Sequence, residues 1–242
     1  GRELVFENDS GGTYDLYRLP LPSLTFAADP EPALAPPAPV ATYRFAPAVA
    51  ARVPDLSGTG NDATVVGRLT WEDGALRFGD GSLQVTTPKG CDFGNGPFYV
   101  TVRLQVDRHT DALRLVVVGD YPEHHLGWQI YLNDRNQVYF NARSPSGEFV
   151  GACSPRPFPT GRLVEVTGSR DAQGRVRLYL DGVAIAEATG ATLSYGTPNQ
   201  VRVGCQFNGG APFSGRLAAL EIGRGTPPCY KTRAQLLQEV FQ

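Results

Sequence analysis

Hydrophobic and polar residues alternate along most of the chain beyond residue 40, in short segments separated by turn formers. In Phe98–Val106 every even-numbered residue is apolar, which is the period of a half-buried β-strand. Similar patterns predict further strands at residues 113–118, 127–132, 137–143, 148–153, 163–167, 176–185, 200–207 and 215–222. Many short strands at close intervals predict an all-β domain.

The alternation also predicts how the strands pack. We expect an antiparallel two-sheet β-sandwich whose sheets bury their apolar faces against each other. The residues expected between the sheets are Val102, Leu104, Ile130, Phe140, Val166, Leu178 and Val203. Residues 232–241 instead have helical spacing, with Leu236, Leu237 and Val240 on one face, so we expect a short C-terminal helix.

Composition agrees with many strands joined by tight turns, because the 242 residues include 28 Gly and 20 Pro and are 41% hydrophobic. The net charge is −2 and no basic run is present, so nucleic acid is not an expected partner. No apolar stretch approaches the roughly 20 residues that cross a bilayer, and no membrane span is expected. The chain lacks an initiator Met, which we interpret as a mature chain or a segment of a longer one.

Three parts are expected along the chain. Residues 1–19 carry two strand-like segments around the turn 7–12, which predicts a hairpin appendage. Residues 20–39 contain seven prolines and are expected to form an extended linker. Residues 40–242 are expected to form the sandwich.

Two motifs carry a family resemblance. The run Asp55-Leu-Ser-Gly-Thr-Gly-Asn-Asp62 is rich in turn formers and is followed by short β segments and by Gly79-Asp80-Gly81. The second motif is Phe213-Ser-Gly-Arg-Leu-Ala-Ala-Leu-Glu-Ile222. Together they resemble the laminin-G-like, concanavalin A-like lectin/glucanase jelly-roll family over residues 40–242. This resemblance implies a jelly roll, in a family whose members bind glycans or proteins and in a few cases are catalytic.

Catalysis is not expected from this chain alone. Glycanases of this fold commonly carry paired carboxylates on one strand, whereas Glu165 stands alone between Val164 and Val166. No nucleophile motif accompanies the three histidines, His109, His124 and His125. The hairpin in residues 1–19 resembles the last strands of a sialidase propeller. The chain is therefore also interpretable as a piece of a sialidase-like glycoside hydrolase whose active site lies elsewhere.

A polar and aromatic surface is the best candidate site. Alternation turns a set of residues in the segments 127–132 and 137–143 away from the core, and a later segment adds two amides. These candidates are Gln129, Tyr131, Tyr139, Asn141, Arg143, Gln206 and Asn208. Aromatic rings stack on the C–H faces of sugars, while amide and guanidinium groups bond sugar hydroxyls, so the set suits a glycan or polysaccharide. The alternatives are an ordinary solvated face, or a site in rim loops around Asn95, His124 and His125.

Calcium is the cofactor that the family resemblance implies. Asp55, Asn61 and Asp62 match the turn in which relatives hold a structural Ca²⁺. The chain departs from that pattern at Ala218-Ala219, where many relatives carry an acidic residue. Plain turn chemistry is the competing interpretation of these three residues.

The four cysteines, Cys91, Cys153, Cys205 and Cys229, lack metal-binding spacing. They permit two disulfides, with buried free thiols as the alternative, and modestly favour a secreted protein. The sequence therefore predicts a non-catalytic carbohydrate-binding or accessory domain of a secreted carbohydrate-active protein, attached to other domains of a larger polypeptide. The alternatives are the glycoside hydrolase fragment and a sandwich with a protein-interaction or structural role.

Overall fold

The computed structural model describes residues 3–6, 17–20, 38–45, 51–121, 125–143, 149–190, 196 and 198–227. The chain divides into two compact units, Gly1–Leu34 and Ala35–Gln242. In the first unit, β1 (Glu3–Phe6) pairs antiparallel with β2 (Tyr17–Pro20), with Phe6 opposite Tyr17. Most of the predicted linker lies outside the described residues.

The described part of the second unit contains only strands, turns and loops, as the alternation predicts. The predicted helix at residues 232–241 lies outside the described residues. The strands are β3 (Pro39–Arg44), β4 (Arg52–Val53), β5 (Ala63–Glu72), β6 (Ala75–Thr86), β7 (Phe98–Val106), β8 (Arg114–Tyr121), β9 (His125–Leu132), β10 (Val138–Arg143), β11 (Phe149–Cys153), β12 (Val164–Arg170), β13 (Arg175–Leu180), β14 (Val183–Thr189), β15 (Gln200–Val203) and β16 (Gly215–Arg224).

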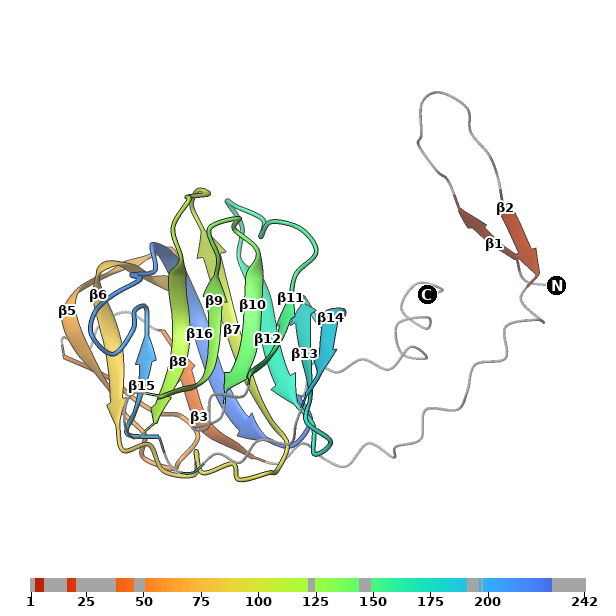
Figure 1. The fold of residues 1–242 in the computed structure, drawn as a ribbon. Coiled ribbons are helices and arrows are strands. Elements are labelled where there is room, and N and C mark those ends of the chain that lie inside the picture. The colour runs from red at the N-terminus through yellow and green to blue at the C-terminus, as the bar shows by residue number, and fades with distance from the viewer. Residues whose placement is uncertain are drawn as a thin grey trace. The chain divides into compact units, whose positions relative to one another are not determined.

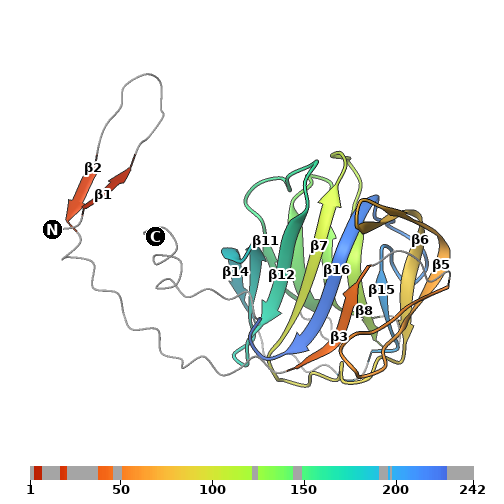
Figure 2. The same cartoon turned by 180° about the vertical axis from the view of Figure 1, so that it is seen from behind.

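The strands form two layers of antiparallel strands. The front layer runs β11-β10-β9-β8-β15-β6, and the back layer runs β16-β7-β12-β13-β14, with β3 beside β16. Figure 1 shows β8, β9 and β10 in front of β7 and β16, and Figure 2 shows the back layer from the other side. This layering matches the expected jelly-roll sandwich.

The two layers are continuous rather than separate, which differs from the expected pair of sheets. Strand β6 pairs with β15 through residues 83–86 and with β16 through residues 76–78, so one 14-stranded, barrel-like sheet folds back on itself. The bend lies where Gly81 faces Gly67 on β5. A Cβ atom at Gly81 would lie 2.6 Å from the backbone oxygen of Arg68, so the close approach of the two backbones requires glycine.

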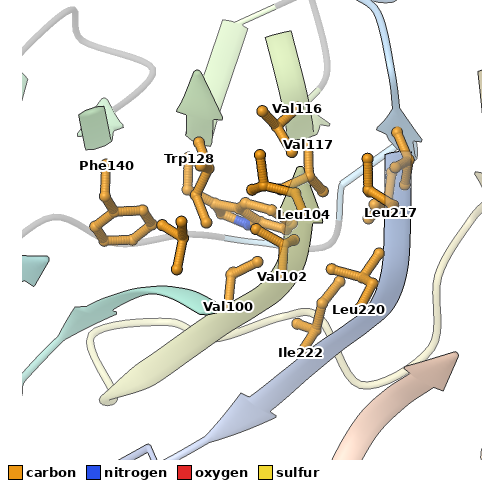
Figure 3. Packing of buried hydrophobic residues seen from close by; sticks show 14 of the residues in the cluster. Val100, Val102, Leu104, Val116, Val117, Trp128, Phe140, Leu217, Leu220 and Ile222 are labelled. Carbon is orange, nitrogen blue, oxygen red and sulfur yellow. The ribbon is translucent and has the colours of Figure 1, made fainter. Parts of the chain in front are cut away.

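The core lies between the layers. All seven residues that alternation predicts to be internal are buried, which confirms the expected facing of β7, β9, β10, β12, β13 and β15. Figure 3 shows side chains of β7 and β16 meeting Trp128 of β9 and Phe140 of β10 across the interior. Burial of this apolar surface is the main stabilising contribution to the fold.

Strand β15 is shorter than predicted, because it ends at Val203 instead of continuing to residue 207. Gly204 has a φ of +92° and turns the chain out of the ladder. A Cβ atom there would lie 2.4 Å from Cδ1 of Phe78, so the turn packs directly against the core. The predicted tight turn at Asp181-Gly182 is present, with positive φ at both residues.

Cys91, Cys153 and Cys205 are free, and Cys229 lies outside the described residues. A Cys153–Cys205 disulfide, one of the pairings that four cysteines permit, does not fit the fold, since strands β10, β9 and β8 lie between β11 and β15. Four strand spacings amount to about 19 Å, far beyond the reach of a disulfide. In the described segments we find no helix with the length and apolar character needed to cross a bilayer.

Candidate functional site

The candidate site lies on the outer face of the front layer, where two rows of side chains cross the strands. The tyrosine row contains Cys153, Tyr139, Tyr131 and Leu115, in the order β11, β10, β9 and β8. The amide row contains Gly151, Asn141, Gln129, Val118 and Arg202, and continues from β11 to β15. Residues directly opposite one another share a face, so four predicted site residues are brought together as neighbours.

Tyr131 and Tyr139 stack on each other, with ring centroids 5.1 Å apart and an interplanar angle of 14°. We expected each ring to offer an open face, but the mutual stacking occupies part of one face of each. Burial raises the pKa of Tyr131, and a hydrogen bond with Asn141 partly opposes that rise. A hydrogen bond with the Cys153 thiol, followed by burial, raises the pKa of Tyr139 to about 12. Both hydroxyls therefore stay protonated at neutral pH.

The two amides beside the tyrosines are less exposed than an outward polar row should be. Asn141 is only 1% exposed, and the neighbouring β8 residues Leu115 and Val118 are fully buried on the same face. The carbonyl oxygens Oδ1 of Asn141 and Oε1 of Gln129 are buried and accept no hydrogen bond within the described part of the chain. An unsatisfied buried acceptor costs about 1–3 kcal/mol, so two adjacent ones call for an explanation.

Arg143 occupies the next outward position of β10, and its backbone pairs with Phe149 of β11. Its side chain lies outside the described residues, as does His124 of the rim alternative. The side chain of His109 is described, and its Nε2 atom lies 2.7 Å from the backbone oxygen of Phe158. Asn95 is exposed in the loop before β7.

Gln206 and Asn208 do not lie on a strand, which corrects the expectation that a later strand carries them. They form a turn in which the backbone N–H of Gln206 donates to the carbonyl of Gly210, and the N–H of Gly210 donates to Oδ1 of Asn208. The loop still reaches the candidate site, because the N–H of Leu115 donates to the carbonyl of Ala211 at 2.9 Å.

Arg202 is a site residue that was not selected from the sequence. It is directly opposite Val118 in the amide row, and its Nη2 atom donates to the carbonyl of Phe207 at 3.0 Å. The guanidinium thus ties the amide row to the 204–210 loop. Alternation of residues 200–203 would have placed Arg202 on the outer face, beside Gln200.

The predicted calcium residues form a hydrogen-bonded turn centred on Asp55. Its Oδ1 atom accepts from the N–H groups of Thr42 and Ser57, and its Oδ2 atom accepts from the hydroxyls of Ser57 and Thr59 and from the N–H of Asn61, all at 2.8–2.9 Å. Burial alone would raise the pKa of Asp55, but the backbone hydrogen bonds outweigh it and lower the pKa to about 2.

These residues do not fit a calcium ion in the arrangement that the structure shows. Oδ1 of Asp62 accepts from the N–H of Asp55, its Oδ2 lies 3.2 Å from the Arg52 guanidinium, and Oδ1 of Asn61 accepts from the N–H of Lys89. A cation needs oxygen lone pairs that face it, whereas here they face hydrogen-bond donors. The family resemblance predicts calcium and this arrangement argues against it, so a direct test is given below.

The strand order and the two layers define an antiparallel jelly-roll sandwich. Sequence comparison identifies its family. The family model Laminin_G_3, described as "Concanavalin A-like lectin/glucanases superfamily", matches residues 79–225, more than half of the 242 residues. The chain belongs to this superfamily. No curated protein matches the sequence.

Solved structures of the same fold include bacterial toxin domains. The binding domain of botulinum neurotoxin DC, in complex with SialylT, has a TM-score of 0.62 at 12% identity. The botulinum neurotoxin serotype D binding domain has a TM-score of 0.65 at 10% identity, and that of Paraclostridial Mosquitocidal Protein 1 has 0.64 at 16%. The matches cover 84–85% of this chain and 52% of each of the others. At this identity the likeness shows the fold.

Proposed function

We propose that this chain is a carbohydrate-binding domain that acts without catalysis and binds a glycan at the outer face of the front layer. The observation that carries the proposal is the pair of buried amide oxygens, on Asn141 and Gln129, that accept no hydrogen bond from any described residue. They lie next to the stacked pair of Tyr131 and Tyr139.

The chemistry of this face suits sugar hydroxyls. An amide oxygen is an acceptor only, and a hydroxyl is a donor that also accepts, so a glycan can satisfy Asn141 and Gln129 while taking bonds from the tyrosine hydroxyls. The ring faces that the mutual stacking leaves free add contact with the C–H groups of the sugar. An arginine, Arg202, lies farther along the same row, opposite Val118.

The comparisons also support the proposal. The superfamily contains lectins, and one structural neighbour is described in complex with SialylT. We further propose that the domain is secreted and serves as an accessory domain of a larger carbohydrate-active protein.

A glycan array probed with the full chain, followed by calorimetry on each glycan that binds, tests the proposal. Asn141→Leu should change the free energy of unfolding little, because removal of the unsatisfied buried acceptor offsets the lost hydrogen bond with Tyr131. The same change should weaken glycan binding about three- to tenfold, through the loss of a net hydrogen bond of about 0.5–1.5 kcal/mol.

Gln84→Ala is the matched control, because Gln84 continues the amide row on β6 beyond Arg202, remote from the tyrosines. Its affinity should equal that of the wild type. Absence of any glycan ligand, or unchanged affinity in Asn141→Leu, would contradict a binding site on this face.

A further inference from the structure

Phe149 is an exposed aromatic side chain at the edge of the candidate site. It is 58% exposed, and the other large apolar side chains with high exposure in the described segments are aliphatic: Leu56, Val66, Leu113 and Val183. Scattered aliphatic side chains on a surface need no explanation. An aromatic ring beside a candidate binding row is a different case, because it offers a flat face to a ligand.

The pairing of β10 with β11 places Phe149 next to the amide row. Phe149, Gly151 and Cys153 alternate on the outer face, and Gly151 is directly opposite Asn141. A Cβ atom at Gly151 would lie 3.1 Å from Cζ of Phe149 and 3.0 Å from Cβ of Asn141. The ring therefore extends across Gly151. A side chain at position 151 would crowd the ring and displace it from Asn141.

The amide next to this ring is the one whose acceptor is unused. Asn141 is almost fully buried, and its Oδ1 atom accepts no hydrogen bond from a described residue. Tyr131 lies diagonally across from Asn141 on the same face and does not donate to this oxygen. The amide oxygen is therefore left for a donor from outside.

We propose that Phe149 is the stacking platform of the glycan site and binds a neutral pyranose ring at the β11 edge. The proposal rests on the proposed function and specifies its ligand. The C–H face of the sugar lies on the Phe149 ring, turned outward from Gly151, and one sugar hydroxyl donates to Oδ1 of Asn141. An ionised carboxylate can only accept hydrogen bonds, so this acceptor favours a sugar hydroxyl over a carboxylate.

Nuclear magnetic resonance with three monosaccharide probes tests the proposal directly. Methyl β-glucopyranoside and methyl β-galactopyranoside are the neutral probes, and methyl β-glucuronopyranoside is the acidic one. At least one neutral probe should bind, with upfield shifts of its C–H protons caused by the aromatic ring. Phe149→Ala should weaken its binding up to about tenfold and abolish the upfield shifts.

Phe149→Leu separates ring stacking from general apolar contact, since leucine keeps an apolar side chain at the β11 edge but has no ring face. It should lose affinity as Phe149→Ala does, whereas Phe149→Trp should retain it. All three changes lie on an exposed side chain, so unfolding should move little. Wild-type affinity in Phe149→Leu would overturn the proposal that the Phe149 ring stacks on the sugar. If Asn141→Leu still weakens glycan binding in that case, the proposed function stands and only the role of Phe149 is lost. A wild-type chain that binds no glycan overturns both.

Discussion

Gly119 of β8 lies directly opposite Trp128 of β9, and the indole ring fills the space that a side chain at position 119 would need. A Cβ atom at Gly119 would lie 2.4 Å from Cε2 of Trp128. Trp128 is fully buried between the layers, as Figure 3 shows, and the next residue along β9 is Gln129 of the amide row. The packing of the indole against Gly119 therefore holds β9 in place, and with it the position of Gln129 on the outer face.

Gly119→Ala should destabilise the chain by about 1–3 kcal/mol, because the added methyl overpacks the core against a large ring. Denaturant unfolding measures this change. Gly79→Ala is the control, since no atom lies within 4 Å of a Cβ placed at Gly79, and its unfolding should stay close to that of the wild type. Equal stability of both variants would show that the indole has room to shift.

Tyr139→Ala removes half of the tyrosine pair. The free energy of unfolding should fall by about 0.5–1.5 kcal/mol from the loss of stacking on Tyr131. Glycan affinity should fall up to roughly tenfold. Tyr139→Phe keeps the ring and should keep the stability, so a loss of affinity in that variant would assign the binding to the hydroxyl. Wild-type affinity in both variants would place the site elsewhere.

Asp55 should make stability depend on pH in acid. Its pKa of about 2 in the folded chain lies below the roughly 3.9 of an unfolded aspartate, so its ionised form stabilises the fold above pH 4. That stability is lost as the pH falls from about 4 to 2. Asp55→Asn should be less stable at pH 7 and show a flatter pH profile in this window. An unchanged slope would contradict the hydrogen-bonded carboxylate.

Calcium removal tests the metal prediction. Because the oxygens of Asp55, Asn61 and Asp62 already accept hydrogen bonds, EDTA should leave the melting temperature unchanged, and added Ca²⁺ should not raise it. The measurement is a thermal unfolding series with EDTA, Mg²⁺ and Ca²⁺. A selective rise with Ca²⁺ would restore the calcium site and require the turn to rearrange around the ion.

Local patterns predicted the core and the cross-strand neighbours well. The alternation in Phe98–Val106 and in residues 127–132 and 137–143 is a property of each strand, and the side chains face as expected. The pairing of Tyr131 with Tyr139 also follows from a short hairpin, because its register depends on only a few residues between β9 and β10.

Features that depend on distant contacts could not be read from the sequence. The early end of β15 depends on Gly204 meeting Phe78, more than a hundred residues away. The burial of Asn141 depends on the register of β11, which places Gly151 and Phe149 beside it. The merging of two sheets into one depends on β6 pairing with both β15 and β16. Each of these is decided by tertiary packing.

The position of β16 has a consequence for biosynthesis. This strand, Gly215–Arg224, lies between β7 on one side and β3 and β6 on the other, although it is the last described strand of the chain. Until it emerges from the ribosome, β3 and β7 lack their shared neighbour, and the core lacks Leu217, Leu220 and Ile222. Such late, non-local pairing slows folding and exposes the nascent chain to aggregation. A chain truncated before residue 215 should therefore fail to reach the native state, even in the presence of chaperones.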